Sequence, residues 1–161
     1  MKTVDYILLD CADHPGWDAI PGLMTAMYDR MNEMGLMIPL AEGGLEMWLR
    51  SAKNTTGKFG IVVLAKWDEM PVGFAHGLLK FMPDYLGNYT VGMITHVYVI
   101  SEARNNGIGN ELARQLESYF RQKNVHSIEL QVIPGNRDAV KFWESLGYSE
   151  ELIQYRKIDL R

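Results

Sequence analysis

Apolar residues along the chain repeat with two different periods, which separates predicted strands from predicted helices. Runs that are continuously apolar, or that alternate at every second position, predict strands. These runs occupy residues 3–9, 58–67, 71–81, 89–100, 126–133 and 148–158. Only Asp68, Glu69 and Met70 separate the second run from the third, so we predict a hairpin there.

Apolar residues three or four positions apart predict four helices. The first begins at Pro21, a residue favoured in a first turn, and stops at Gly35. Its apolar face consists of Leu23, Met24, Met27, Tyr28, Met31 and Met34. The second helix contains residues 45–52. The third begins within residues 103–115 and ends at about Lys123, and the fourth covers residues 137–146 before Gly147.

The resulting order is β-α-α-β-β-β-α-β-α-β, which predicts a mixed sheet covered by helices. A chain of 161 residues is long enough for one domain with its own core. No repeat, low-complexity tract or linker-like stretch interrupts it. We therefore predict a single domain spanning residues 1–161.

Composition and charge narrow the range of functions. Apolar residues make up 47% and charged residues 22%, as in ordinary globular proteins. A net charge of −4 argues against binding to a nucleic-acid backbone, and no apolar run approaches the ~20 residues that span a membrane. The single cysteine, Cys11, and a first segment unlike a cleavable signal favour the cytoplasm.

Residues 103–115, ARNNGIGNELARQ, lie between a predicted strand and a predicted helix. The first turn of a helix has N–H groups without intrahelical partners and carries partial positive charge. Gly107 and Gly109 lack a Cβ, which lets a bulky anion approach, and Arg104 adds a permanent cation. This pattern predicts a phosphate or pyrophosphate site, although glycine and asparagine also begin helices for structural reasons alone.

Two known anion-binding motifs fit poorly. The P-loop requires Lys and Ser or Thr where this chain has Asn110 and Glu111, so we reject it. The dinucleotide-binding motif requires a third glycine where this chain has Leu112. Glu129 lies at about the right distance for the ribose-binding acid, but the predicted strand continues past it, so this interpretation is weak.

The segment Arg-x-x-Gly-x-Gly after a strand resembles the pyrophosphate-binding motif of the GCN5-related N-acetyltransferase (GNAT) superfamily. A second segment, NRDAVKFWESLGY at 136–148, resembles that family's later motif, and the order of elements agrees over nearly the whole chain. The resemblance implies the α/β (α+β) GNAT fold, with a mixed, mostly antiparallel sheet of about six or seven strands flanked by about four helices. It also implies an N-acetyltransferase that uses acetyl-CoA as cosubstrate and no metal.

By this resemblance, backbone N–H groups of the loop and first helical turn hold the pyrophosphate of coenzyme A, with help from Arg104. These groups belong to Asn105, Asn106, Gly107, Ile108, Gly109 and Asn110. Backbone groups of Val97 and Val99 pair with the pantetheine arm, as an added strand would. Asn136 contacts the pantetheine or phosphate arm, and it also suits the N-cap of the following helix.

Trp143 departs from the family pattern, because many relatives have a tyrosine there that protonates the leaving thiolate. An indole does not release its proton near neutral pH, so Trp143 packs beside pantetheine or within the core. Tyr98, Tyr148 or water is then left to protonate the thiolate, unless it leaves unprotonated. The departure keeps a second class of function open, a catalytically silent acyl-CoA-binding or regulatory module on the same fold.

Direct transfer requires removal of a proton from the attacking amine. His96, beside Val97 on the predicted central strand, has an ordinary pKa of about 6.5 that suits this task; a hydrogen-bonded histidine in a half-buried face is the equally weighted alternative. Glu129 on the next strand is the second candidate base, with a solvated or salt-bridged position as its alternative. His76 and Thr95 rank below them.

The acceptor is less clearly encoded. In this fold the first two helices and residues 83–88 wall the acceptor site, where acidic residues attract an ammonium group or form a solvated face. These acids are Asp29, Glu33, Glu42, Glu46 and Asp84. We expect a small-molecule or peptide amine, and the sequence leaves the oligomeric state open, a homodimer included.

Overall fold

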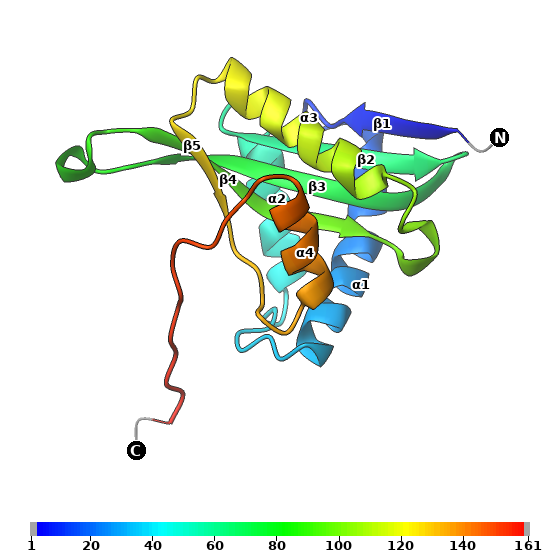
Figure 1. The fold of residues 1–161 in the computed structure, drawn as a ribbon. Coiled ribbons are helices and arrows are strands. Elements are labelled where there is room, and N and C mark those ends of the chain that lie inside the picture. Colours follow the sequence, from blue (N-terminus) through cyan, green and yellow to red (C-terminus); the bar gives the residue numbers. More distant parts are fainter. Residues whose placement is uncertain (1–2, 160–161) are drawn as a thin grey trace.

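A single sheet with helices on both faces forms the protein in the computed structural model, which describes residues 3–159 (Figure 1). Its strands are β1 (Val4–Leu8), β2 (Gly60–Trp67), β3 (Met70–Phe81), β4 (Thr90–Val99) and β5 (Ser127–Leu130). They lie in the order β1-β2-β3-β4-β5, and every pair is antiparallel except the parallel pair of β4 and β5. The predicted mixed, mostly antiparallel sheet is confirmed.

The four predicted helices are also present. They are α1 (Ile20–Glu33), α2 (Gly44–Thr55), α3 (Ile108–Gln122) and α4 (Arg137–Ser145). Short 3-10 helices cover Pro15–Ala19, Asp84–Leu86 and Ser101–Ala103. None of the helices described is long and apolar enough to cross a membrane.

Each face of the sheet has its own hydrophobic core. Phe74 belongs to the core under α1 and α2, whereas Phe120 belongs to the core under α3 and α4. Neighbouring residues of β2 alternate between them, with Val62 in the first and Val63 in the second. A strand buried on both faces is apolar at every position, which explains the continuous run in the sequence.

The predicted hairpin joins β2 to β3. Asp68 and Glu69 both have positive φ angles, 52° and 35°, as the central residues of a type I′ turn require. This turn follows the right-handed twist of the two strands, so it holds them in register.

Two strand predictions were wrong. Residues 148–158 form no strand within the described chain, so the sheet has five strands rather than six or seven. β5 ends at Leu130 instead of residue 133, because its pairing with β4 stops at Ile94 and Leu130. Since residues 131–133 do not continue the strand, they no longer argue against the dinucleotide motif. The argument that remains is Leu112, which is fully buried in the core.

Candidate active site

A β-bulge and a divergence of strands open the sheet in the middle of β4. The pairing with β3 passes from His76 and His96 to Gly77 and Ile94, so Thr95 is the extra residue of the bulge. On the other edge of β4, the pairing with β5 ends at Ile94. Beyond that point, this edge of β4 has no neighbouring strand in residues 3–159.

The open edge exposes backbone groups of the two valines that the sequence singled out. The N–H of Ile100 donates to the Val72 carbonyl of the β3 side at 2.9 Å. Because successive residues of a strand point to opposite edges, Val97 and Val99 point away from β3. The Val99 carbonyl accepts a hydrogen bond from Arg104 Nε at 2.9 Å, and an extended ligand has access to the remaining groups of this edge.

The loop between β4 and α3 bends through left-handed conformations. Asn105 has φ 61°, and Gly107, the N-cap residue of α3, has φ 77°. The Asn106 side chain donates to the carbonyls of Ala103 and Arg104, at 3.2 and 2.8 Å. A Cβ at Gly107 would meet no atom within 4 Å, so the backbone lies open at this position.

Six consecutive N–H groups, those of residues 105–110, have no acceptor within residues 3–159. The first hydrogen bond of α3 runs from the Glu111 N–H to the Gly107 carbonyl at 3.1 Å. Unpaired donors at the positive end of a 15-residue helix are suited to bind an anion. The loop therefore has the features of an anion site, and its glycine leaves the backbone accessible.

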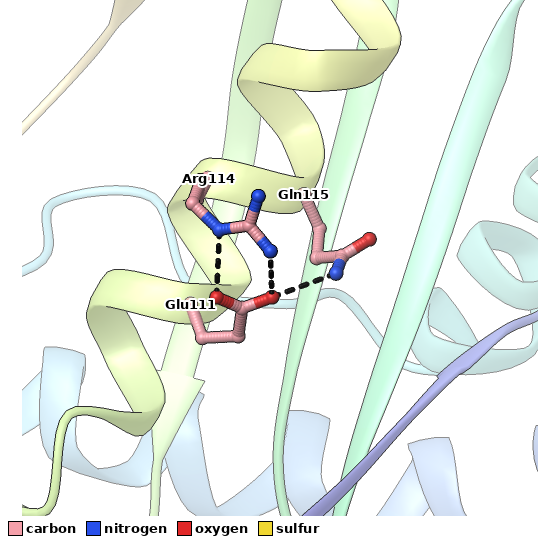
Figure 2. A network of polar contacts seen from close by, with 3 residues as sticks. All are labelled: Glu111, Arg114 and Gln115. Atoms are coloured by element: carbon pink, nitrogen blue, oxygen red, sulfur yellow. Dashed lines mark hydrogen bonds and ion pairs between the residues drawn. The ribbon is translucent and has the colours of Figure 1, made fainter.

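A carboxylate in the first turn of α3 is neutralised by its neighbours (Figure 2). Glu111 accepts two hydrogen bonds from Arg114, at 2.7 and 2.6 Å, and one from Gln115 at 2.7 Å. The bonds from Arg114 hold the pKa of Glu111 below its ordinary value. The Arg114 guanidinium thus offsets the negative charge that Glu111 would otherwise present beside the open N–H groups.

Arg104 and Tyr98 form the end of the open edge. Arg104 Nε is held by the Val99 carbonyl, and the guanidinium carbon lies 5.9 Å from the centre of the Tyr98 ring. Arg104 forms no ion pair with an acid in the described chain. A fixed cation with no acidic partner therefore lies next to the loop.

Helix α4 packs against the first turn of α3. Asn136 Oδ1 accepts from the Ala139 N–H at 3.2 Å, which confirms its N-cap role. A Cβ at Gly109 would lie 3.3 Å from the Phe142 ring, so Gly109 provides space for this packing. The two glycines of the motif thus differ: Gly107 is open, and Gly109 faces α4.

Trp143 is a core residue with 8% of its surface exposed. Its ring contacts Phe142 and Tyr148, with centroids 4.9 and 5.1 Å apart. The Tyr148 hydroxyl donates a hydrogen bond to Glu117 of α3 at 3.0 Å. Burial, and then the neighbouring carboxylate of Glu117, raise the pKa of this hydroxyl well above its ordinary value. Tyr148 is therefore a poor proton donor to a leaving thiolate.

On the α1 and α2 face, His76 and His96 share one threonine. Thr95 Oγ1 lies 2.5 Å from His76 Nδ1 and 2.8 Å from His96 Nδ1, and it donates to the His76 carbonyl at 3.1 Å. The indole of Trp48 contacts both imidazoles, at 5.1 and 5.3 Å between centroids. Tyr28 of α1 lies 6.2 Å from the His96 ring.

The contacts of Thr95 are compatible with one form of both imidazoles. A hydroxyl has one proton, and all three contacts are satisfied together when it donates to the His76 carbonyl and accepts from both Nδ1–H groups. In this arrangement both neutral imidazoles have an unprotonated Nε2. Burial lowers the pKa of His76 to about 3, with a further contribution from His96, and lowers that of His96 to about 4.

Other sequence candidates lie outside this cluster. Glu129 forms an ion pair with Lys80 at 2.6 Å. This is the salt-bridged alternative that the sequence analysis gave for this residue. The acidic residues of the first two helices and the loop at 83–88 are exposed. No group of three His, Cys, Asp or Glu residues in the described chain is arranged to hold a metal ion. The Cys11 side chain is exposed, and no contact ties it to the site.

Sequence reasoning missed the importance of His76 and Thr95. Simple alternation along β4 places Thr95 and His96 on opposite faces of the sheet. The bulge brings the Thr95 hydroxyl to both imidazoles, and the register of the hairpin places His76 opposite His96. The sequence did show one histidine on each of two neighbouring predicted strands. Whether the two lie opposite each other depends on the strand register, which the sequence pattern does not give.

Comparisons with known proteins gave a family match and similar solved structures. The family model described as "Acetyltransferase (GNAT) family" matches residues 23–148. A search of curated proteins gave no match. Among solved structures, the chain is similar to the aminoglycoside N-acetyltransferase AAC(6')-Iy in complex with CoA, with 16% identity, a TM-score of 0.77, and coverage of 98% of this chain and 96% of that one.

Two further solved structures differ in the acceptor that their names imply. The aminoglycoside acetyltransferase meta-AAC0020, from an uncultured soil metagenomic sample, has 17% identity and a TM-score of 0.72, with 98% and 97% of the two chains covered. The ribosomal-protein-alanine N-acetyltransferase from Brucella melitensis biovar Abortus 2308 has 18% identity and a TM-score of 0.67, with 98% and 100% covered. At these identities the likeness establishes the fold.

Proposed function

Because the chain belongs to the acetyltransferase (GNAT) family, we propose that it moves an acetyl group from acetyl-CoA to a primary amine by direct attack within a ternary complex. N-acetyltransferase activity and acetyl-CoA as cosubstrate follow from membership of this family. The direct route, the residue roles and the acceptor are our proposals.

The observation that carries the proposal is a continuous row of backbone donors beside the open strand edge. The pyrophosphate binds the N–H groups of residues 105–110, and Arg104 adds its positive charge. The pantetheine arm lies along the open edge of β4, where it bonds to Val97 and Val99 as an added strand would. Asn136 and Trp143, from α4, flank this arm.

The thioester carbonyl then lies near the bulge. The amine nitrogen attacks this carbon, and the N–H of Val97 stabilises the oxyanion that forms. His96 Nε2 accepts a proton from the nitrogen, the C–S bond breaks, and the acetyl group stays on the amine. Tyr98 or water protonates the leaving thiolate, and Glu129 is the alternative base.

The acceptor is an amine on a small molecule or a peptide. The names of the similar structures include both aminoglycoside and ribosomal-protein-alanine acetyltransferases, so both classes belong in the test. The net charge of −4, with exposed acids on α1 and near α2, favours an acceptor that carries additional positive charge.

A panel of amines with acetyl-CoA tests the proposal. It covers aminoglycosides, polyamines, amino acids and peptides with free N-termini, and release of the CoA thiol is measured. We expect turnover with at least one cationic class. Binding of acetyl-CoA without turnover across the panel would instead support a catalytically silent acyl-CoA-binding module.

A further inference from the structure

His76 is a buried histidine to which the proposed reaction assigns no role. Its side chain is 3% exposed, and it lies on β3, where it pairs with His96 of β4. Nδ1 lies 2.5 Å from Thr95 Oγ1, whereas Nε2 is buried and has no hydrogen-bond partner in residues 3–159. Burying a polar side chain is costly unless it is hydrogen-bonded. The contact with Thr95 therefore offsets the burial of this imidazole.

The unequal surroundings of its two nitrogens place the His76 proton. Burial lowers the pKa of His76 to about 3, so the ring is neutral and carries one N–H group. A buried N–H group without an acceptor is rare in folded proteins. The proton therefore lies on Nδ1, where Thr95 Oγ1 accepts it, and the buried Nε2 is the unprotonated nitrogen.

Thr95 then has one proton to donate and two acceptors within reach. The His76 carbonyl lies 3.1 Å from Oγ1, and His96 Nδ1 lies 2.8 Å from it. If the hydroxyl donated to His96 Nδ1, the carbonyl contact would be lost and His96 would carry its own proton on Nε2. Because Nδ1 and the carbonyl belong to the same residue, His76 holds Oγ1 at two points and favours donation to its carbonyl.

Aromatic contacts keep the two rings in place. Trp48 of α2 meets His76 and His96 edge to face, with interplanar angles of 79° and 77°. Phe74 stacks on His96, with an interplanar angle of 25° and 6.2 Å between the ring centroids. These contacts resist rotation of the His96 ring, so its tautomer is set by the direction in which the Thr95 hydroxyl points.

We propose that His76 is a positioning residue for acetyl transfer, which acts through Thr95 to keep the proton of neutral His96 on Nδ1 and its Nε2 free. The inference rests on the proposed function, in which His96 Nε2 accepts a proton from the attacking nitrogen. That proton joins Nε2 while the Nδ1–H group stays bonded to Oγ1. A His96 protonated on Nε2 would instead present a donor where the reaction needs an acceptor.

Replacements of His76 with and without a polar group near Nδ1 test this role. Asparagine places its amide near the position of Nδ1 and bonds to Thr95, whereas leucine has nearly the same shape and no polar group. Phenylalanine keeps the volume of a ring. ¹⁵N NMR of histidine-labelled protein reports which nitrogen of His96 is protonated, and comparison with His96→Gln identifies its signals. We expect Nδ1–H in the parent and in His76→Asn, and a large Nε2–H population in His76→Leu and His76→Phe.

Steady-state kinetics give the second readout. We expect His76→Leu and His76→Phe to lower kcat by roughly tenfold or more, with KM for acetyl-CoA unchanged, because part of the enzyme then lacks a free Nε2. His76→Asn recovers most of the parent's kcat. Val62→Ala is the control for lost packing, because Val62 is fully buried and lies opposite His76 on β2. It keeps the parent's His96 tautomer and kcat.

A parent His96 that carries its proton on Nε2 would overturn the proposal. His76→Leu and His76→Phe variants with the parent's tautomer and kcat would do the same, as would a His76→Asn variant that loses as much as His76→Leu. If no amine is acetylated, the proposed function fails, but the NMR comparison needs no substrate and still decides whether His76 sets the tautomer of His96.

Discussion

Nε2 of His96 forms no hydrogen bond with a described residue, whereas Nδ1 is hydrogen-bonded to the Thr95 hydroxyl. Burial lowers its pKa to about 4, so the imidazole is neutral at every pH near neutrality. A base this weak does not remove a proton from a free ammonium ion. It suits the more acidic nitrogen of the tetrahedral adduct, where the new C–N bond has already withdrawn electron density.

We predict that His96→Gln lowers kcat by roughly 10²–10⁴-fold, because the amide cannot accept this proton as an imidazole does. Affinity for acetyl-CoA, measured by calorimetry, stays near that of the parent. The parent's kcat shows no inflection near pH 6.5 from His96, since the group is already neutral there. A Gln variant with the parent's kcat would exclude His96 as the proton acceptor.

Thr95→Val is the companion variant, because it keeps the shape of the bulge residue and removes the hydroxyl that orients both rings. A smaller loss of kcat than in His96→Gln is expected if Thr95 only positions the base.

Trp143 contributes to stability through its buried ring. We predict that Trp143→Ala lowers the free energy of unfolding by about 3–5 kcal/mol, the range for deleting a buried large aromatic side chain. Urea denaturation measures the change, and Trp143→Phe, which keeps most of the packing, is expected to lose less. An alanine variant as stable as the parent would mean that the indole does not belong to the core.

At the scale of elements, the boundary between β4 and α3 provides the anion site that we propose. The strand supplies an open edge, and the helix supplies unpaired donors and a positive end. Only a residue without a Cβ adopts φ 77° at Gly107 without strain while leaving the approach open.

Gly107→Val is therefore expected to weaken acetyl-CoA binding by roughly tenfold or more, since a bonded phosphate gains about 1.5–3 kcal/mol from each charged hydrogen bond. The variant also strains the backbone, so Gly35→Val is the control. Gly35 has φ 88° and equally open surroundings, but it lies after α1, away from the loop. Calorimetry on both variants separates binding from strain. Equal affinities in the two variants would contradict the phosphate-site assignment.

Local patterns predicted most elements because burial imposes them. Helix α3 buries Leu112, Leu116 and Phe120 on one face, and the sequence shows this spacing directly. Residues 148–158 have the apolar content of a strand, but a strand also needs a neighbour, and the described chain provides none. The apolar pattern therefore indicated that the segment suits a sheet, but it did not indicate whether a neighbouring strand was available.

The same limit applies to the candidate site. The loop at 105–110 was predictable because its chemistry is local: glycine, asparagine and a helix start occur together in the sequence. The contact of His76 with Thr95 depends on strand register and on a one-residue bulge. Gly109 was predicted to open the backbone, and only the packing of α4 shows that it accommodates Phe142.

For the whole molecule, the sheet separates the two substrates that we propose. The open edge of β4 and the start of α3 lie on the side of the cosubstrate, while the histidines face α1 and α2. These regions meet at Thr95, because this residue directly follows the last β4 residue paired with β5 and its hydroxyl lies beside both imidazoles. In the proposed reaction, the acetyl donor and the amine acceptor therefore approach the bulge from different sides.

The buried histidines also make the stability of the whole protein depend on pH. His76 is 3% exposed, and its pKa is lowered from 6.5 to about 3, so the unfolded chain binds a proton on this residue at a pH where the native protein does not. Stability is then fully present above pH 6.5 and is lost as the pH falls toward 3. At about 1.36 kcal/mol per pH unit, His76 alone accounts for roughly 2 kcal/mol between pH 6.5 and pH 5.

Replacing this residue therefore has an effect that grows with acidity. We predict that His76→Gln, which does not titrate, has a shallower decline of unfolding free energy between pH 7 and pH 5 than the parent, by roughly 2 kcal/mol over this range. His126→Gln, at an exposed position, is the matched control and follows the parent. Urea titrations at several pH values give the slopes. If the slopes of His76→Gln and the parent coincide, His76 binds protons equally in the folded and unfolded states. That result would contradict the assignment of a neutral His76 in the folded protein.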